Sequence, residues 1–364
     1  MAFPSGYTKY QEITIASSQV DANLTDYPVY VDLSDLVKAG DDIFDTCRTD
    51  GGDIRVTKSD GTTELAREVV EIDTTAKTGE MHVKFTGTLS STVDTVIRVY
   101  YNGTDTEPAR TATYGSDNVW TDYDLVVHGQ IAGEDSSAND FADVANGNLP
   151  TTATGKVGGA QSFDGTGDYY DFGDQTAFDI DDAGGIDKTV QTWFKKDVLA
   201  VEDAVAGKWG ATSSQRNWLF RNESSGKMRM FLGSGGTTGQ NVQGTTVVGA
   251  GTWGMVHFTW DASENDGSIY TNGADKQTNT SMTTVSASTA KLGWGTEEGA
   301  GGGGSSGQWD GLLDEFRIRS SILSDTWIST EYSNQNSPST FYSTSDEEGG
   351  STASSFPDLR LAFI

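Results

Sequence analysis

The chain has few of the residues that cross-link or stiffen a fold. Among its 364 residues there is a single cysteine, Cys47, and there are only six prolines. One cysteine excludes an intramolecular disulfide, so packing or bound ions must stabilise the protein. Glycine, in contrast, occurs 44 times, and residues that accept a positive φ suit tight hairpins. This composition predicts many short strands joined by tight turns.

Basic residues and long apolar runs are also scarce. The 24 lysines and arginines face 53 aspartates and glutamates, which gives a formal charge of −29. Such a charge opposes binding to nucleic acid and to anionic membranes, so we expect neither partner. No run approaches the roughly 18 apolar residues of a membrane span. The opening MAFPSGYTKYQEITI lacks the parts of a Sec signal, so neither export by that route nor membrane insertion is expected.

The acidic surface has two interpretations. It is either a well-solvated surface or an adaptation to high salt, where screening removes the repulsion between like charges. A halophilic source is therefore one of the open alternatives.

The first hundred residues alternate apolar and polar side chains. Residues 27–33 and 81–85 show the period of half-buried strands, and turn signals occur at residues 50–52 and 59–61. These features predict a β-sandwich module over residues 1–103. The following residues 104–118 are polar and without periodicity, which is typical of a linker.

Two groups of motifs carry a resemblance to known families. CRTDGGDIRVTKSDGTTELAREV, followed by VIRVYYNGT, resembles an uncharacterised β-rich module that commonly precedes LamG domains. From Val119 on, GKVGGAQSFDGTGDYYDFGD, TVQTWFKK, GTWGMVHFTWD and GLLDEFRIRSSILSDTWISTEYSNQ are similar to the LamG-like, concanavalin A-like jelly roll. The resemblance implies an all-β chain of two β-sandwich modules, the second of them a jelly roll over residues 119–333.

The residues of this second module fit that reading on physical grounds. Residues 228–232 and 256–260 alternate as sandwich strands do, and Asn272-Gly273 marks a two-residue hairpin. One short helix is predicted near its end, because Ser324 can cap an apolar stripe. The stripe consists of Leu323, Trp327, Ile328 and Tyr332. We expect this helix to cover one edge of the sandwich.

The sequence contains no catalytic pattern. The concanavalin A-like hydrolases resemble E-x-D-x-x-E, and neither residues 71–73 nor residues 264–266 complete that motif. The three histidines lie inside strand patterns and have no nucleophile beside them: His82, His128 and His257. They also lack the spacing of a zinc site along the chain. We therefore expect a protein that is not an enzyme and does not bind zinc.

One acidic residue has an unusual phase. In GLLDEFRI, strict alternation places Asp314 on the inward face with Leu312, Phe316 and Ile318. A buried carboxylate needs a partner, because an unpaired charge costs several kcal/mol. The resemblance implies a structural calcium ion where the last strand passes the F-D-G turn, with Asp164, Gly165 and Asp314 as ligands. The alternative is that Asp314 accepts hydrogen bonds from backbone amides without an ion.

Tryptophans are candidates for sugar binding, because an aromatic face packs on the C–H face of a pyranose. Three lie beside glycine-rich loops: Trp209, Trp294 and Trp309. The alternative for each is packing beneath its loop.

The C-terminal residues 334–364 predict a polar tail that ends in an apolar strand. Leu359, Leu361 and Phe363 alternate on one face. Such a strand should pair with a sheet edge, and we expect the edge of a neighbouring subunit in a homo-oligomer.

Two functions fit these features. The first is a non-catalytic structural or adhesive protein on a large extracellular assembly, namely a virion component such as a capsid decoration, turret or tail fibre, with a glycan-binding role. Its partners would be other virion subunits, bound through the tail, and a cell-surface glycan. The alternative is a carbohydrate-binding accessory module of a bacterial or archaeal cell-surface or secreted protein.

Overall fold

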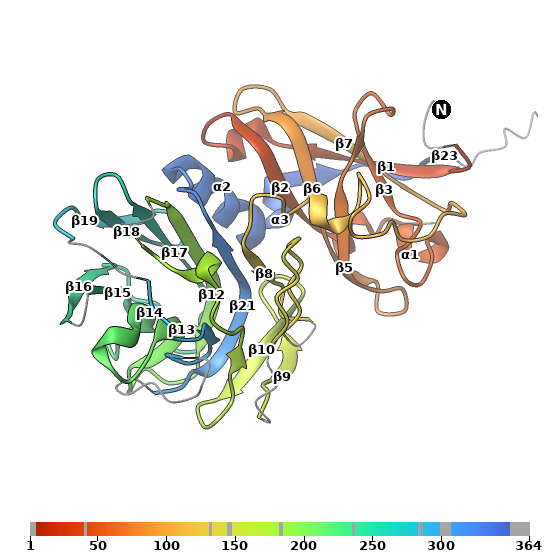
Figure 1. The fold of residues 1–364 in the computed structure, drawn as a ribbon. Coiled ribbons are helices and arrows are strands. Elements are labelled where there is room, and N and C mark those ends of the chain that lie inside the picture. The colour runs from red at the N-terminus through yellow and green to blue at the C-terminus, as the bar shows by residue number, and fades with distance from the viewer. Residues whose placement is uncertain are drawn as a thin grey trace, which may run out of the picture.

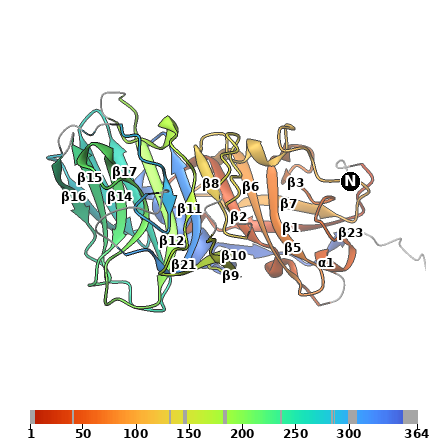
Figure 2. The same cartoon turned by 60° about the horizontal axis from the view of Figure 1, so that its bottom comes forward.

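The protein consists of two β-rich lobes with a C-terminal segment between them (Figures 1 and 2). The computed structural model describes residues 5–39, 42–130, 133–143, 148–181, 185–234, 237–282, 285, 287–298 and 307–349. Nearly all regular structure is β, so the predicted all-β class is confirmed. Within these residues, no helix has the length and apolar composition needed to cross a membrane.

The N-terminal lobe is a sandwich of two antiparallel sheets. One sheet has the order β22-β1-β7-β3-β4, with β23 also paired to β1, and the other has the order β2-β6-β5. The strands are β1 (Lys9–Ile15), β2 (Leu24–Asp32), β3 (Arg55–Lys58), β4 (Glu64–Leu65), β5 (Arg67–Asp73), β6 (Thr78–Leu89), β7 (Thr95–Tyr101), β22 (Tyr342–Thr344) and β23 (Glu348–Gly349). The apolar residues of 27–33 and 81–85 share its core, as their alternation predicts.

The C-terminal lobe contains an eight-stranded sheet and a six-stranded sheet. Their orders are β19-β18-β17-β12-β21-β10-β9, with β8 paired to β21, and β11-β20-β13-β14-β15-β16. The first sheet comprises β8 (Leu125–Val127), β9 (Thr151–Thr154), β10 (Gly159–Asp164), β12 (Lys188–Lys196), β17 (Gly254–Asp261), β18 (Asp266–Thr271), β19 (Asp275–Asn279) and β21 (Asp310–Arg319). The second comprises β11 (Tyr170–Asp171), β13 (Asp203–Trp209), β14 (Arg216–Asn222), β15 (Met228–Ser234), β16 (Thr237–Gln243) and β20 (Gly293–Trp294).

The sandwich core of this lobe follows the predicted alternation. Met228, Met230 and Leu232 face inward, and so do the apolar residues of 256–260. The hairpin between β18 and β19 turns at Asn272 and Gly273, whose φ angles are 53° and 76°. Thr271 pairs with Asp275, so the connection holds three residues, Asn272, Gly273 and Ala274, one more than the predicted two-residue hairpin. The positive φ angles explain the Asn-Gly pair.

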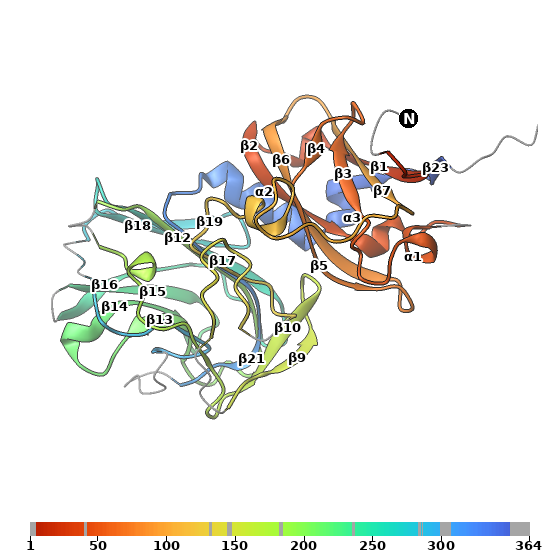
Figure 3. The ribbon, with the colours of Figure 1, turned by 45° about the vertical axis from the view of Figure 1, so that its right-hand side comes forward.

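Helix α2 (Asp325–Asn336) lies between the two lobes (Figure 3). Ser324 caps it as predicted, because its side chain accepts a hydrogen bond from the Trp327 backbone amide. Trp327 and Ile328 belong to the core of the N-terminal lobe. Tyr332 stacks on Trp193 of the C-terminal lobe, with ring centroids 5.6 Å apart. The helix therefore joins the two sandwiches, whereas the sequence predicted that it covers the edge of one.

The segment after this helix differs from the predicted polar tail. Residues 334–349 form the end of α2, helix α3 (Pro338–Phe341) and the strands β22 and β23, which add to β1. Phe341 and Tyr342 are buried in the N-terminal core. Polar composition misled the prediction, because Asn334 uses its amide to bind the backbone N–H and C=O of Tyr30 at 2.8 and 2.9 Å. Residues 350–364, with Leu359, Leu361 and Phe363, lie outside the described residues.

A β-bulge interrupts β21. Gln191 of β12 pairs with Arg317, and Trp193 pairs with Asp314, so two residues of β21 oppose one of β12. Glu315 in the bulge has a φ of 52°. Leu313, Phe316 and Ile318 consequently face the sandwich core. Because a bulge shifts the alternation by one residue, Asp314 lies on the opposite face from Phe316 and Ile318, which corrects the predicted shared face.

The remaining short elements lie in connections. They are α1 (Ile43–Thr46) and single 3-10 turns at Ser17–Gln19, Leu33–Leu36, Ser116–Asn118, Thr176–Phe178 and Ser213–Gln215.

Candidate functional site

The junction of the two lobes buries a cluster of charged side chains. We call it the junction cluster and define it by these residues: Glu68, Glu80, His82, His128, Glu315, Arg317 and Glu331. It draws on β5 and β6 of the N-terminal lobe, on β21 and the end of β8 in the C-terminal lobe, and on α2 between them. Charged groups are rarely buried without partners, so their arrangement needs an explanation.

Strand β6 supplies two members of the cluster. Glu80 and His82 are two residues apart and point to the same side, while Met81 and Val83 face the core of the N-terminal lobe. Both side chains are fully buried. His82 Nε2 lies 2.8 Å from Glu80 Oε1, so a proton is shared between the imidazole and the carboxyl group.

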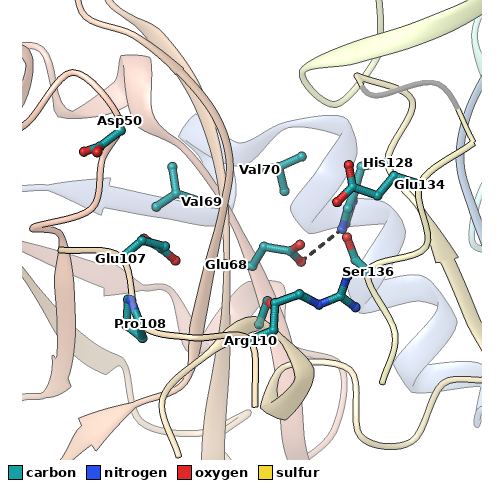
Figure 4. Close-up of a pocket in the computed structure, with 11 residues that line it drawn as sticks. Asp50, Glu68, Val69, Val70, Glu107, Pro108, Arg110, His128, Glu134 and Ser136 are labelled. Carbon is teal, nitrogen blue, oxygen red and sulfur yellow. Dashed lines mark hydrogen bonds and ion pairs between the residues drawn. The ribbon is translucent and has the colours of Figure 1, made fainter. Parts of the chain in front are cut away.

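His128 sits at the centre of the cluster. Its Nδ1 lies 2.7 Å from Glu315 Oε1 and 3.4 Å from Glu80 Oε1. Its Nε2 lies 3.2 Å from Glu68 Oε2, the contact drawn as a dashed line in Figure 4. The His128 and His82 rings stack with centroids 4.8 Å apart. One histidine of the C-terminal lobe thus contacts three groups of the N-terminal lobe.

Arg317 closes the cluster on the side of α2. It forms ion pairs with Glu315 and, at 2.9 Å, with Glu331. Its guanidinium carbon lies 4.5 Å from the centre of the Trp120 ring, a cation–π geometry. Glu331 also contacts His257 Nε2 at 3.1 Å. Glu315 and Arg317 are two residues apart on β21, so alternation places both on the face that meets the N-terminal lobe.

The electrostatics of the cluster favour a charged pair at its centre. Burial alone would lower the pKa of His128, but Glu315 and Glu68 outweigh burial and raise this pKa well above its usual value. Burial alone would raise the pKa of Glu315, but Arg317 and His128 outweigh it and lower this pKa. His128 and Glu315 therefore form an imidazolium–carboxylate pair at neutral pH.

The two residues from β6 behave differently. Burial, together with the negative charge of Glu315, raises the pKa of Glu80 well above its usual value. Burial and the charge of His128 lower the pKa of His82 well below its usual value. A neutral Glu80 and a neutral His82 therefore lie beside the charged pair, since this interior holds more carboxylates than cations.

A cavity of about 230 Å³ opens beside the cluster. Figure 4 shows Glu68 and His128 in its wall, together with Arg110, Glu134 and Ser136. Polar and apolar groups contribute about equally to its lining, and His128 and Glu68 lie in its wall.

The structure does not bring the predicted calcium ligands together. Asp164 is exposed and pairs in register with Asp310, four residues before Asp314. At about 3.3 Å per residue, Asp164 and Asp314 are separated by about 13 Å along the strand. Asp314 is fully buried, and its Oδ2 accepts hydrogen bonds from the Lys156 and Val157 amides, each at 2.9 Å. These two hydrogen bonds correspond to the alternative in which Asp314 accepts from backbone amides. A calcium ion near Asp164, Gly165 or Asp314 remains a prediction.

The three candidate sugar platforms are all buried. The exposed fractions are 3% for Trp209 and 0% for Trp294 and Trp309. Trp294 stacks on Phe316 inside the sandwich, with centroids 5.7 Å apart. These rings pack beneath their loops, so they present no face to a glycan in this conformation.

A group of aromatic and arginine side chains lies on the outer face of the six-stranded sheet, with the buried Trp209 beneath it. We call it the arginine face: Trp209, Arg216, Arg221, Arg229 and Phe231. Arg221 and Arg229 are cross-strand partners on β14 and β15, and their guanidinium carbons lie 4.6 and 5.4 Å from the Phe231 ring centre. Arg216 is 5.3 Å from the Trp209 ring centre.

Sequence reasoning missed both groups of residues. The expectation that there is no zinc site rested on spacing along the chain, but the fold brings His82 and His128 together from different lobes. A usable signal was the pair Glu80 and His82, which places two polar side chains on one side of a strand whose other side is apolar. In the sequence, the only sign of the arginine face was the set of residues at alternate positions of β14 and β15.

Two packed antiparallel sheets define the C-terminal lobe as a jelly-roll-like β-sandwich. Residues 164–329 match the family model described as the concanavalin A-like lectin/glucanases superfamily, which confirms the predicted resemblance for this lobe. No curated protein matches the chain.

Several solved structures are similar to the chain at low identity. Domain 4 of AbnA, an extracellular GH43 arabinanase from Geobacillus stearothermophilus solved with arabinotriose, is 19% identical, with a TM-score of 0.45; the match covers 58% of this chain and 98% of that one. The receptor binding domain of botulinum neurotoxin type G is 13% identical, with a TM-score of 0.42, and coverages of 59% and 51%. The CBM40 of a Ruminococcus gnavus sialidase, bound to sialyllactose, is 14% identical, with a TM-score of 0.33, and coverages of 40% and 83%. The chain thus spans about half of the neurotoxin domain. Similarities with TM-scores below 0.5 do not define the function of this protein.

Proposed function

We propose that the protein is a non-catalytic glycan-binding protein of an extracellular surface, and that the arginine face holds an acidic sugar. The observation that carries the proposal is the arginine face itself, on a domain that matches the lectin/glucanase superfamily. The sugar class follows from the chemistry of the face.

The arginine face offers both contacts that a sugar needs. Phe231 supplies an aromatic ring, which can pack on the C–H face of a pyranose. Arg221 and Arg229 supply planar sets of N–H donors, which bind a carboxylate in bidentate fashion. Three arginines on one face stand out in a chain with only 24 basic residues, so this face selects sugars that carry a carboxylate or sulfate.

Two glutamates position the guanidinium groups. Glu223 lies 2.8 Å from Arg221 Nη2 and 3.5 Å from Arg229 Nε, and Glu202 lies 3.2 Å from Arg221 Nη1. Cross-strand arginines repel one another unless a carboxylate lies between them. Glu223 therefore holds two like charges side by side in the free protein.

The same geometry supports a binding role without hydrolysis. Glycoside cleavage needs two carboxyl groups that flank an accessible bond. The paired carboxyl groups of the junction cluster are buried, and on the arginine face both Glu202 and Glu223 are engaged by arginines.

A glycan array tests this proposal with the full chain. We expect binding to uronate-, sialate- or sulfate-bearing glycans, weakening as salt rises because screening reduces the attraction. Arg221→Gln and Phe231→Ala should each weaken binding by about tenfold or more, which corresponds to about 1.4 kcal/mol. Arg98→Gln is the matched control, because Arg98 also pairs with a glutamate and lies over a tyrosine ring, but in the N-terminal lobe. Equal binding by all variants, or no binding to any glycan, would reject the proposal.

The setting that we propose is a large extracellular assembly, with the protein as a virion component. The apolar alternation of Leu359, Leu361 and Phe363 supports it, because such a strand suits pairing with a neighbouring subunit. An accessory module of a cell-surface protein is the alternative. The first setting is tested by deleting residues 350–364 and comparing the mass of the assemblies formed by the truncated and the full chain. Loss of assembly on truncation supports this setting, and unchanged assembly contradicts it.

A further inference from the structure

We propose that Glu80, His82, His128 and Glu315 bind one divalent transition-metal ion, which joins the two lobes. Zinc is the metal that we expect. This site is separate from the arginine face and does not depend on glycan binding. Its ligands come from β6 of one lobe and from β8 and β21 of the other, so the ion would bridge the domain junction.

The distances among the ligand atoms fit such an ion. One ligand atom of each residue lies within 4.8 Å of all the others. Three of the separations are 2.7 Å for His128 Nδ1 to Glu315 Oε1, 2.8 Å for His82 Nε2 to Glu80 Oε1, and 3.4 Å for His128 Nδ1 to Glu80 Oε1. Ligands held at about 2.0 to 2.1 Å around a tetrahedral zinc ion lie about 3.3 Å from one another. Small rotations of the side chains would therefore form the coordination shell.

Hydrogen bonds already orient the ligands from outside. Glu68 contacts His128 Nε2 at 3.2 Å, so a metal ion that displaces the proton from Nδ1 would leave the other proton on Nε2, donated to Glu68. This is the carboxylate–histidine–metal arrangement of natural sites. Gln130 donates to Glu80 Oε2, and Arg317 donates to Glu315 Oε2. Each carboxylate therefore has one oxygen held by a donor and the other directed at the histidines.

The charge balance of the junction also favours a cation. Four carboxyl groups lie around the two histidines: Glu68, Glu80, Asp314 and Glu315. Arg317 is the fixed positive charge that faces them, and it is shared with Glu331. A divalent ion would supply positive charge among these carboxyl groups.

The donor set selects the kind of metal. Two imidazole nitrogens and two carboxylate oxygens suit zinc and its first-row neighbours. Calcium prefers six to eight oxygen ligands and does not match two histidines. The cavity lies on the other side of His128, at Nε2 and Glu68, so it leaves the four proposed ligands buried.

Metal analysis of the full chain tests the site directly. Protein purified without chelators should carry about one equivalent of zinc per chain. After chelation and dialysis, added Co²⁺ should give the visible absorption of a tetrahedral site at one equivalent, and Zn²⁺ should displace it. Zn²⁺ should raise the melting temperature of the stripped protein, and Ca²⁺ at the same concentration should not. A wild-type chain that binds neither Zn²⁺ nor Co²⁺ stoichiometrically would overturn the proposal, because a hydrogen-bonded network then explains the cluster.

Variants locate the ion. His82→Gln and His128→Gln should abolish the cobalt spectrum. His257→Gln should retain it, because His257 is also buried and bound to Glu331 but lies outside the four ligands. Glu80→Gln has nearly the shape of glutamate and keeps an oxygen at this position, so it should fold while binding cobalt at least about tenfold more weakly. Unchanged binding by Glu80→Gln and either histidine variant would contradict the assignment.

Discussion

The core of the C-terminal lobe and the domain junction are buried to the same degree but are built from opposite chemistry. The core consists of tryptophan, phenylalanine, methionine and aliphatic residues from two sheets. The junction buries Glu80, Glu315, Arg317 and two histidines. One strand, β21, contributes to both, with Phe316 on one face and Arg317 on the other. The comparison shows that alternation along a single strand can place a hydrophobic core and a charged interface on its opposite sides.

The two regions also stabilise the protein in different ways. Removing apolar area from water favours the core wherever its residues pack. Burying charges costs desolvation, and the mutual attraction of the charges offsets this cost only in good geometry. The core therefore supplies stability, whereas the junction cluster specifies how the lobes are arranged.

The largest expected effect comes from the segment that links the two regions. Deleting residues 334–364 removes Asn334, Phe341 and Tyr342 and the edge strand β22, so the N-terminal lobe should fail to fold stably. Deleting only residues 350–364 removes none of the contacts described above and should leave the melting temperature unchanged. Circular dichroism melts of the two truncations decide between a folded element and a dispensable tail. Equal stability of both would show that residues 334–349 do not complete the N-terminal sheet.

A cavity in the core should be the next most damaging change. Trp294→Ala removes a fully buried ring that stacks on Phe316 and on Tyr170, each with centroids 5.7 Å away. We expect a loss of about 3 to 5 kcal/mol in the free energy of unfolding, as for other large-to-small core changes. Urea denaturation measures it. A loss below about 1 kcal/mol would mean that the sandwich is not packed as described.

Disrupting the junction cluster should lower the free energy of unfolding somewhat less than the Trp294→Ala cavity does. Arg317→Leu removes the guanidinium, which takes the arginine partner from Glu331 and leaves Glu315 with His128 alone; we expect this to cost about 3 kcal/mol. The double variant Arg317→Leu with Glu331→Leu should recover part of this loss, because it removes one of the unpaired charges. Urea denaturation of both proteins gives the comparison. If the double variant loses as much stability as the two single substitutions lose when added together, Arg317 and Glu331 do not interact.

The smallest effect is expected at Asp314. Burial, together with the charge of Glu315, raises the pKa of Asp314 well above its usual value, which favours the neutral carboxyl group. Asp314→Asn keeps an oxygen for the Lys156 and Val157 amides and should change stability by less than about 1 kcal/mol. A calcium ion at Asp314 would make the same change strongly destabilising and would make the wild-type melt sensitive to a calcium-selective chelator. Thermal melts with and without chelator distinguish these outcomes.

The sequence predicted the fold well where local patterns decide it. The alternation in residues 228–232 and 256–260 and the cap at Ser324 formed as expected, and the turn at Asn272-Gly273 formed with one residue more than predicted. Each depends on neighbours within a few residues, so each is visible in the sequence.

The candidate sites were much less predictable, because long-range contacts decide them. The bulge at Glu315 depends on pairing with β12, more than 120 residues earlier, and it reversed the expected face of Asp314. His82 and His128 meet only because the lobes dock. The polar residues after Asn334 looked disordered, although their polar groups bind backbone atoms of the N-terminal lobe.

Scanning calorimetry of the intact chain tests most directly the claim that the junction cluster couples the two lobes. The account predicts one cooperative transition for the wild type, and two separated transitions for Arg317→Leu, because the lobes then unfold independently. Trp294→Ala should shift the wild-type transition downward without splitting it. Two separate transitions in the wild type, or a single transition in the Arg317→Leu variant at the wild-type temperature, would contradict it.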